Sequence, residues 1–288
     1  MTSVMDAIEQ TPGTVGVAAK HLETGDEVSH NADMVFFTAS TLKVPLIVEL
    51  YRQVDAGKID LDQRIELTDE LRVPGSGVFK ELGAGLNPKI RDLAMLMIII
   101  SDNTATDILY NMVGRENLNN TMQELGLTKT RIPMRTRELL YDVVGLDVDN
   151  PTHTYRMASD KLFLQQWVSD ADGFSEEKSD VSSPSDMSRL LEMIYRGEVV
   201  SASSREGILD IMKRQQLNTV IPHLLPTGTE SAHKTGSYHS VRCDVGIVYA
   251  PNGPYTVAIM AKHMEGDRME GDLALARVSR SIYDAFSG

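Results

Sequence analysis

The sequence predicts an α+β fold in which strands from both ends of the chain form one antiparallel sheet flanked by helices. An all-helical lobe is inserted between the two groups of strands. Three observations support this: strand-like stretches near the N-terminus, a long middle region of helical periodicity, and a Val- and Ile-rich hairpin near the C-terminus. We expect a sheet domain of residues 1–38 and 216–288, a helical domain of residues 39–215, and a functional cleft between them.

The N-terminal part reads as two strands followed by a helix. Residues 14–19 (TVGVAA) are typical of a strand, and the Thr24-Gly25-Asp26 turn leads to a return strand at residues 27–30. Residues 40–56 carry apolar side chains at helical spacing, and Gly57 is a typical helix stop. The sequence therefore predicts a hairpin that feeds directly into an amphipathic helix.

The middle region predicts a series of helices. Residues 90–100 are apolar on nearly every side, so we expect a helix buried at the centre of the helical domain. Helices at residues 105–113 and 116–125 follow it. Residues 183–196 begin with a Ser-Pro-Ser-Asp capping pattern, and residues 204–214 form one more predicted helix.

The C-terminal part returns to strands. Residues 240–249 and 255–262 are rich in Val and Ile, the turn at residues 251–254 joins them as a hairpin, and a last helix is predicted at residues 271–286. Residues 136–180 are the least regular part of the chain and carry an acidic patch, so we expect a long surface excursion there.

Composition excludes several classes of function. The chain of 288 residues has 28 Lys+Arg against 41 Asp+Glu, a formal net charge of -13 that disfavours nucleic-acid binding. Its 42% apolar and 24% charged residues are ordinary for a globular protein and exclude disorder as the main organisation. A single cysteine, Cys243, excludes an intrachain disulfide and a Cys-based zinc site.

Neither a membrane span nor a metal site is expected. The longest purely apolar run, residues 93–100, is too short to cross a bilayer, which takes about 20 residues. The seven histidines show no metal-ligand spacing. Residues 1–10 show no signal peptide, so we expect a cytoplasmic protein, or a periplasmic or secreted one if a leader has been removed. We expect a monomer that acts on a small molecule without a cofactor.

The first of three chemical motifs is Ser40-Thr41-Leu42-Lys43, an S-x-x-K pattern. A second S-x-x-K lies at residues 175–178, within the acidic patch and without apolar neighbours. The first opens an amphipathic helix, where residues i and i+3 share a face and Lys43 can reach the Ser40 hydroxyl. A buried lysine of lowered pKa can remove the proton of a serine nucleophile, and the free amides of a helix start suit an oxyanion.

Two further motifs follow in the chain. Ser101-Asp102-Asn103 comes after the buried helix, where a hydroxyl can pass a proton to a leaving group and an amide can bind a substrate amide. Lys234-Thr235-Gly236 precedes the C-terminal hairpin and offers a positive charge, a hydroxyl and room for the close approach of a substrate backbone. His233 and His239 flank this third motif and are candidates for lining the same cleft.

Together, S-x-x-K, S-D-N and K-T-G in this order resemble the class A β-lactamase-like serine hydrolases, over nearly the full chain. The resemblance implies a β-lactamase/transpeptidase-like fold. It implies that Ser40 is the acylated nucleophile, Lys43 its base, and Ser101 the proton relay to the leaving nitrogen. The residues implied to bind substrate are Asn103, Lys234, Thr235, Gly236, Ser237 and, as a weaker match, Arg242.

The same resemblance implies further roles at the cleft. The backbone amides of Ser40 and Ser237 would form the oxyanion hole. Residues 183–187 (SPSDM) resemble the start of the helix after the family's omega loop. Asp180 stands where that loop is usually fastened, with Arg131 as its possible partner.

One departure concerns the second half of the reaction. Class A β-lactamases carry an E-x-x-L-N pattern that activates the deacylating water, and residues 131–180 contain none. Glu138 is a candidate base, although it lies outside that pattern, as do Asp142, Asp147 and Asp149. Three activities therefore remain open: a β-lactamase, a penicillin-binding protein that traps its acyl-enzyme, and a cytoplasmic esterase or amidase with a repurposed site.

Overall fold

A five-stranded antiparallel sheet forms the spine of the protein. The structure is a computed structural model that describes residues 3–287. The strand order is β2-β1-β7-β6-β5, antiparallel throughout. The strands are β1 (Thr14–His21), β2 (Glu27–His30), β5 (Glu230–Tyr238), β6 (Val241–Ala250) and β7 (Gly253–Lys262). The predicted α+β fold with one sheet built from both ends of the chain is confirmed.

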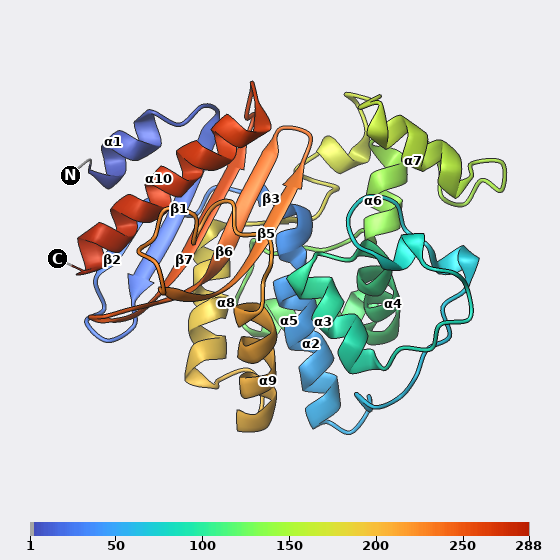
Figure 1. Ribbon diagram of the computed structural model, residues 1–288, viewed down its shortest axis with the longest axis horizontal. Helices are drawn as coiled ribbons and strands as arrows, with labels where there is room; N and C mark the ends of the chain where they lie inside the picture. The colour runs from blue at the N-terminus through green and yellow to red at the C-terminus, as the bar shows by residue number, and fades with distance from the viewer. Residues whose placement is uncertain (1–2, 288) are drawn as a thin grey trace.

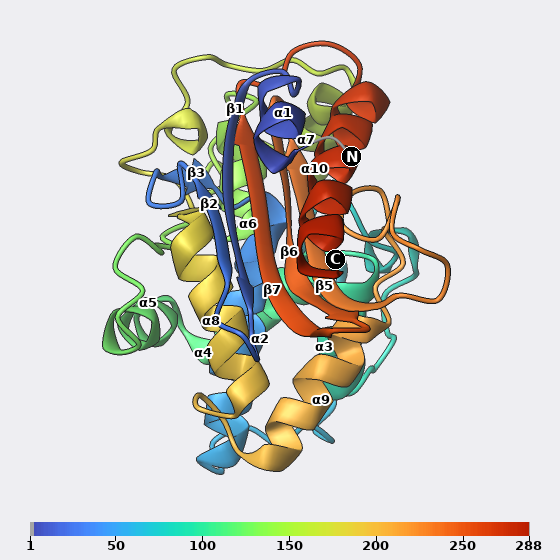
Figure 2. The same cartoon turned by 90° about the vertical axis from the view of Figure 1, so that its left-hand side faces the viewer.

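Two helices from opposite ends of the chain cover the outer face of the sheet. They are α1 (Val4–Glu9) and α10 (Arg268–Ser287), which lie side by side (Figures 1 and 2). Residues of both helices join the strands in one buried apolar cluster, which includes Ile8, Val257 and Leu275. The short α1 was not predicted, because six residues carry too little periodicity to detect.

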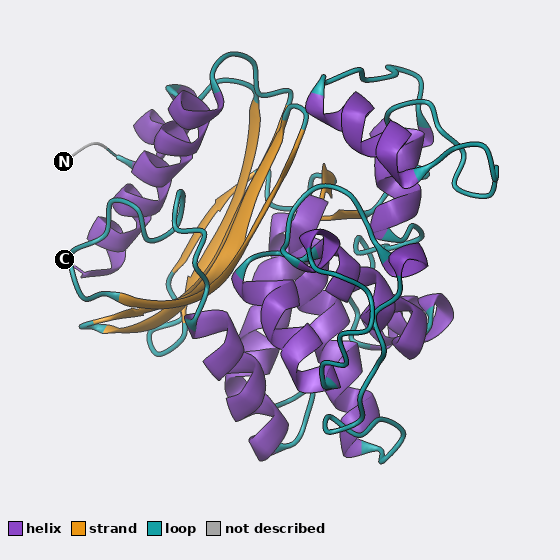
Figure 3. Ribbon diagram, turned by 45° about the vertical axis from the view of Figure 1, so that its right-hand side comes forward, coloured by secondary structure: helices purple, strands orange, loops and turns teal. Residues whose placement is uncertain are grey.

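The inner face of the sheet packs against the helical part of the chain, as Figure 3 shows. Of these helices, α8 and α9 contact the strands directly. The helices are α2 (Lys43–Asp55), α3 (Ile90–Ile99), α4 (Asn103–Val113), α5 (Arg115–Glu124), α8 (Pro184–Arg196) and α9 (Ala202–Lys213). No helix within residues 3–287 is long and apolar enough to span a membrane.

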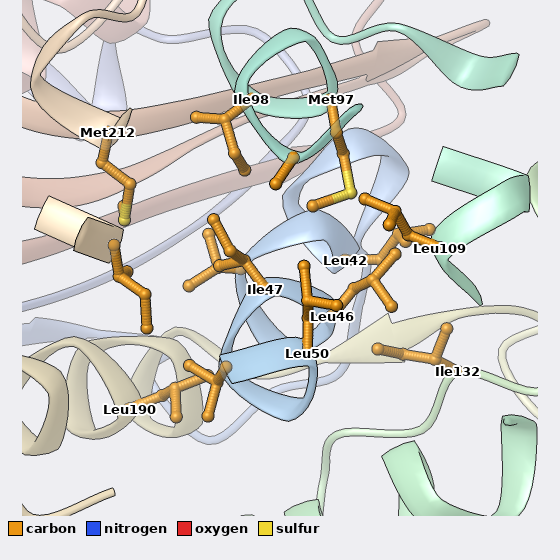
Figure 4. Packing of buried hydrophobic residues seen from close by; sticks show 14 of the residues in the cluster. Leu42, Leu46, Ile47, Leu50, Met97, Ile98, Leu109, Ile132, Leu190 and Met212 are labelled. Carbon is orange, nitrogen blue, oxygen red and sulfur yellow. The ribbon is translucent and has the colours of Figure 1, made fainter. Parts of the chain in front are cut away.

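Helix α2 lies at the centre of the largest apolar core. Its side chains Leu46, Ile47 and Leu50 are fully buried and are surrounded by residues of other helices (Figure 4). We expected α3 to be the central helix, but only half of its residues are buried, against ten of the thirteen in α2. An apolar sequence alone does not distinguish a helix surrounded on all sides from one packed on a single side.

The start of α2 differs from the predicted α-helix. Residues Ala39–Leu42 form a 3₁₀ turn, η1, and α2 begins only at Lys43. Directly before this turn, strand β3 (Phe36–Phe37) pairs antiparallel with strand β4 (Val181–Ser182). This small second sheet places the end of the 136–180 segment next to the residues that lead into η1.

The 136–180 segment is more ordered than the sequence suggests. It contains α6 (Thr136–Asp142), α7 (Tyr155–Phe163) and the 3₁₀ turn η4 (Asp172–Phe174). A separate buried cluster that includes Leu139, Tyr141 and Ala158 holds α6 and α7 together. The expected irregular excursion is therefore a small helical unit with an apolar core of its own.

Candidate active site

The three motifs meet at one cavity of about 290 Å³. Ser40 lies on η1 with a half-buried side chain, so a solvent-borne molecule can reach its hydroxyl. Seven of the residues expected to form a site line this cavity. They are Ser40, Ser101, Asn103, Thr235, Gly236, Ser237 and Arg242.

Lys43 is fully buried beside the second motif. Its Nζ donates hydrogen bonds of 2.9 Å to the Ser101 carbonyl, the Ser101 hydroxyl and the Asn103 side-chain oxygen. Burial lowers the pKa of Lys43 well below its usual 10.5, and the charge of Lys234 lowers it further. We expected Lys43 to reach the Ser40 hydroxyl. Within the described residues, its ammonium group is hydrogen-bonded to Ser101 and Asn103 instead.

The Ser101-Asp102-Asn103 turn is held in an uncommon conformation. Ser101 has a φ of 58°, in the left-handed region that a serine rarely adopts. Asp102 caps α4 through the amide of Ala105 and accepts hydrogen bonds from the amides of Val78 and Phe79. The carboxylate thus ties the loop before α3 to the start of α4 and keeps the Ser101 side chain in place.

Ser76 is a site residue that the motifs did not indicate. Its hydroxyl donates to the Ser101 carbonyl at 2.7 Å and lies 3.2 Å from the Asn103 side-chain oxygen. The amide of Asn103 donates in turn to the Ser76 carbonyl. The only signal in the sequence is the Pro74-Gly75-Ser76-Gly77 turn, which indicates a loop without showing where it packs.

Strand β5 passes closely over η1, and Gly236 makes this possible. A Cβ at Gly236 would lie 2.8 Å from the Ser40 amide nitrogen and 2.8 Å from the Thr38 carbonyl oxygen. The sequence suggested that this glycine admits a substrate backbone. In the structure it first admits the backbone of the nucleophile turn, and so brings Ser237 and Ser40 to the same cavity.

Lys234 is a second fully buried lysine. Its Nζ donates to the Thr235 carbonyl at 2.6 Å. Burial lowers its pKa from 10.5 to about 7, an effect that the nearby Asp244 carboxylate opposes. The fixed positive charge that we expected here is therefore a charge that titrates near neutral pH.

The two histidines beside the third motif do not line the cavity. His233 is buried, with Nδ1 2.9 Å from an Asp244 oxygen and Nε2 3.0 Å from the Asn218 side-chain oxygen. Because side chains alternate along a strand, His233 and Lys234 point to opposite faces of β5. His239 is exposed and packs against the rings of Trp167 and Phe174.

Arg242 lines the cavity but is already engaged. Its Nη1 donates to the carbonyls of His239 and Val241, and its Nε lies 3.5 Å from an Asp272 oxygen. A second guanidinium, that of Arg268, donates to the Ser237 hydroxyl at 2.9 Å and also lines the cavity. No motif indicated Arg268, because the start of α10 has no recognisable pattern.

The expected pairing of Asp180 with Arg131 is wrong. The Arg131 guanidinium donates to the backbone carbonyls of Glu176 and Glu177. Asp180 is buried, and one of its oxygens accepts the Met134 amide at 3.0 Å. Burial raises the pKa of Asp180 from 3.8 to about 8. The sequence showed that both residues lie near the same loop. It did not show that the arginine binds backbone carbonyls and not the Asp180 carboxylate.

Glu138 lies outside the cavity. Its carboxylate forms ion pairs with Arg115 at 2.8 Å and Arg135 at 3.0 Å, and it accepts the Arg135 amide at the start of α6. The wall that α6 presents to the cavity consists of Thr136, Leu139 and Leu140. Among residues 3–287, the only carboxylate that lines the cavity belongs to Asp272.

The arrangement suits nucleophilic chemistry at a carbonyl. The half-buried Ser40 lines the same cavity as Ser101, whose hydroxyl accepts a hydrogen bond from the buried Lys43 amine of lowered pKa. No cluster of three metal-ligating side chains occurs in the part of the chain that the structure describes.

Comparison with known proteins identifies the family. The family described as the Beta-lactamase enzyme family matches residues 1–286. The chain belongs to this family. Beta-lactamase 3 of Bacillus cereus is 25% identical over 277 residues, which cover 94% of this chain and 76% of that protein.

Solved structures of the family have the same fold. A β-lactamase from Sphaerobacter thermophilus superposes with a TM-score of 0.82 at 29% identity, covering 99% of this chain and 97% of that one. PBP-A superposes with a TM-score of 0.80 at 30% identity, covering 98% of this chain and 94% of that one. The family confirms the predicted class A β-lactamase-like serine hydrolase, a hydrolase of β-lactam amide bonds, and its β-lactamase/transpeptidase-like fold.

The burial of Asp180 predicts how stability depends on pH. A carboxyl whose pKa is raised on folding contributes stability that is complete below its unfolded pKa of 3.8 and is lost as pH rises through about 8. The neutral isostere Asp180→Asn does not undergo this loss. We expect the difference in free energy of unfolding between this variant and the wild type to rise in favour of the variant. The rise is up to about 1.4 kcal/mol for each pH unit between these limits. Urea unfolding at several pH values measures this difference, and parallel curves for the two proteins would contradict the assignment.

Proposed function

We propose that the protein opens β-lactams by forming an acyl-enzyme on Ser40. Neutral Lys43 takes the proton of the Ser40 hydroxyl while Oγ attacks the ring carbonyl. The C–N bond of the ring then breaks, and the Ser101 hydroxyl passes its proton to the leaving nitrogen while it takes one from the protonated Lys43, which becomes neutral again. The observation that carries this proposal is the contact of Lys43 Nζ with the Ser101 hydroxyl at 2.9 Å, in a fully buried setting that lowers the pKa of the lysine.

The remaining residues of the cavity hold the substrate in this proposal. The backbone amides of Ser40 and Ser237 stabilise the oxyanion, and the close packing of Gly236 on η1 supports their pairing. Lys234 and Thr235 bind the substrate carboxylate, with Ser237 and the weaker candidate Arg242. A bound carboxylate favours the charged form of Lys234, whose pKa is about 7 without it.

Asn103 binds the amide of the substrate's acyl side chain. Its Oδ1 accepts from Lys43, and its Nδ2 donates to the Pro74 carbonyl at 2.9 Å. Both contacts fix the orientation of the side-chain amide at the cavity wall. The amide is therefore preorganised before a substrate binds.

A second candidate function is a penicillin-binding activity in which the acyl-enzyme persists. The observation that favours it is the apolar wall of Leu139 and Leu140, beside a cavity where the only carboxylate in residues 3–287 is that of Asp272. Asp272 faces Arg242 at 3.5 Å, and an ion-paired carboxylate is a poor base for water. The similarity to PBP-A agrees with this function, because a PBP-A variant has been solved as an acyl-enzyme complex with penicillin G.

The organisation around this activity is also part of the proposal. All strands of the main sheet lie within residues 14–30 and 230–262, which supports a sheet domain of residues 1–38 and 216–288. Residues 39–215 form the helical domain, and the cavity takes lining residues from both. We propose a monomer that acts on a small molecule.

The Ser40→Ala variant tests the nucleophile. Incubation of the wild type with penicillin G is expected to add one drug mass to the intact protein, whereas Ser40→Ala is expected to show neither adduct nor drug consumption. The matched control is Ser175→Ala, in the other S-x-x-K pattern, which lies outside the cavity and should react like the wild type. Adduct formation on Ser40→Ala would refute the proposal.

The Lys43→Met variant tests the base. Replacing the amine with an apolar chain of similar length is expected to slow acylation by about 10²- to 10⁴-fold, the usual contribution of a positioned general base. Stopped-flow measurement of β-lactam opening at saturating enzyme gives this rate. Lys178→Met, an exposed lysine paired with Asp172, serves as the control and should leave the rate unchanged. Equal acylation rates for Lys43→Met and the wild type would remove Lys43 from the mechanism.

A further inference from the structure

A buried carboxylate lies behind the strand that carries the third motif. Asp244, in β6, is completely buried and pairs with Thr235 of β5 in the antiparallel register. Residues that pair directly across two strands point to the same face of a sheet. Asp244 therefore shares a face with His233, and the Lys234 side chain lies on the other face. The proposed function gives this carboxylate no role.

Three contacts hold the Asp244 carboxylate in place. His233 Nδ1 lies 2.9 Å from Oδ1 and 3.2 Å from Oδ2, and the Ile221 amide donates to Oδ2 at 2.9 Å. Because an ionised carboxylate only accepts hydrogen bonds, Nδ1 of His233 carries a proton. Nε2 of the same ring lies 3.0 Å from the Asn218 side-chain oxygen, at the wall of a hollow of about 480 Å³. The carboxylate therefore has a fixed position within the sheet.

The charge of Asp244 acts on Lys234 from the opposite face of the sheet. Burial lowers the pKa of Lys234 to about 7, and the Asp244 carboxylate opposes this shift. The Lys234 amine itself donates to a backbone carbonyl and not to a carboxylate. Charges in a buried setting interact more strongly than charges in water, so a carboxylate can act without contact. Without Asp244, Lys234 would lose its proton at a lower pH and would bind an anion less well.

Other titratable groups face this pair from both sides. They are Lys43, His233, His223, Lys213, Glu230 and Cys243. Lys213 and Glu230 form an ion pair at 2.6 Å, and burial raises the pKa of Cys243 to about 12, so that it stays an uncharged thiol. Within residues 3–287, the negative charge that acts on Lys234 is that of Asp244.

We infer that Asp244 is a positioning residue for substrate binding, whose buried charge keeps the Lys234 ammonium group charged for the substrate carboxylate. The inference rests on the proposed function, in which Lys234 binds that carboxylate. Asp244 does not line the cavity and so acts through Lys234 without touching the substrate. His233 and the Ile221 amide act one step further away, because they hold the Asp244 carboxylate.

The Asp244→Asn variant removes the charge and keeps the shape of the side chain. The new amide can accept from the Ile221 amide and donate to the His233 ring. The second-order rate constant of acylation is measured from about pH 5 to about pH 9, on both sides of the Lys234 titration. Two substrates are compared: penicillin G, and its methyl ester, which lacks the carboxylate charge. If Asp244→Asn does not fold, Asp244→Ser removes the same charge and takes its place.

The matched control is Asp186→Asn, which removes another buried carboxylate. Asp186 accepts the Lys129 amide at 2.8 Å and does not line the cavity. This control variant should keep the pH profile of the wild type with both substrates.

We expect the alkaline limb of the wild-type profile with penicillin G to follow the Lys234 pKa of about 7. Asp244→Asn should move this limb to lower pH by about one unit, which is about a tenfold loss of the rate constant above the limb. The loss should appear as a higher half-saturating concentration, because a bound carboxylate restores the charge of Lys234. The limiting rate at saturation should stay unchanged, and the methyl ester should react equally with both proteins.

Three results would contradict the inference. An alkaline limb at the wild-type pH in Asp244→Asn would show that this carboxylate does not act on Lys234. An equal loss of rate with penicillin G and with its methyl ester would assign Asp244 a purely structural role. Absence of acylation of the wild type by penicillin G would refute the proposed function, and the inference with it.

Discussion

The burial of two lysines in one site is the constraint on which the rest of the structure depends. Lys43 and Lys234 are both fully buried, and their amines donate hydrogen bonds to neutral oxygens. Burial without a carboxylate partner opposes the charged state, so the pKa of each lysine falls. In the proposed function, this lowered pKa lets Lys43 act as a neutral base, and it leaves Lys234 to gain its full charge when an anionic substrate binds. Burying ionisable groups in this way lowers the free energy of unfolding, and functional sites tolerate this loss because their chemistry requires these groups.

The surrounding fold holds these side chains in place. It also determines which groups face the cavity, and so which steps of the reaction the site supports. Gly236 allows β5 to pack closely on the turn that carries Ser40. Asp102 binds the neighbouring loop through two backbone amides and caps α4 through a third. In contrast, the α6 wall places Leu140 at the cavity and leaves Glu138 between two arginines. This geometry therefore supports acylation of Ser40, but among the described residues it places no free carboxylate at the cavity to activate a water.

The sequence predicted what is local and periodic, and missed what depends on packing. The β-rich ends and the helix around Leu46 follow from patterns of two and 3.6 residues, and Ser40, Ser101 and Lys234 follow from short motifs. Ser76 and Arg268 were missed because the residues that they contact, Ser101 and Ser237, are far away in the sequence. The expected Arg131–Asp180 pair was wrong for a related reason. A sequence shows that two charges lie near one loop, but backbone carbonyls compete for the arginine.

The central claim is that the site supports acylation of Ser40, whereas the one carboxylate that residues 3–287 place at the cavity, that of Asp272, faces Arg242 and does not activate a deacylating water. Rapid mixing of the enzyme with an excess of a chromogenic β-lactam tests this most directly, because the first turnover and the steady state appear in one trace. The account predicts a burst of one ring opened per molecule of enzyme, followed by a steady state at least about 100-fold slower, the usual effect of a missing general base. A trace with no burst, in which the steady state is as fast as the first turnover, would contradict it.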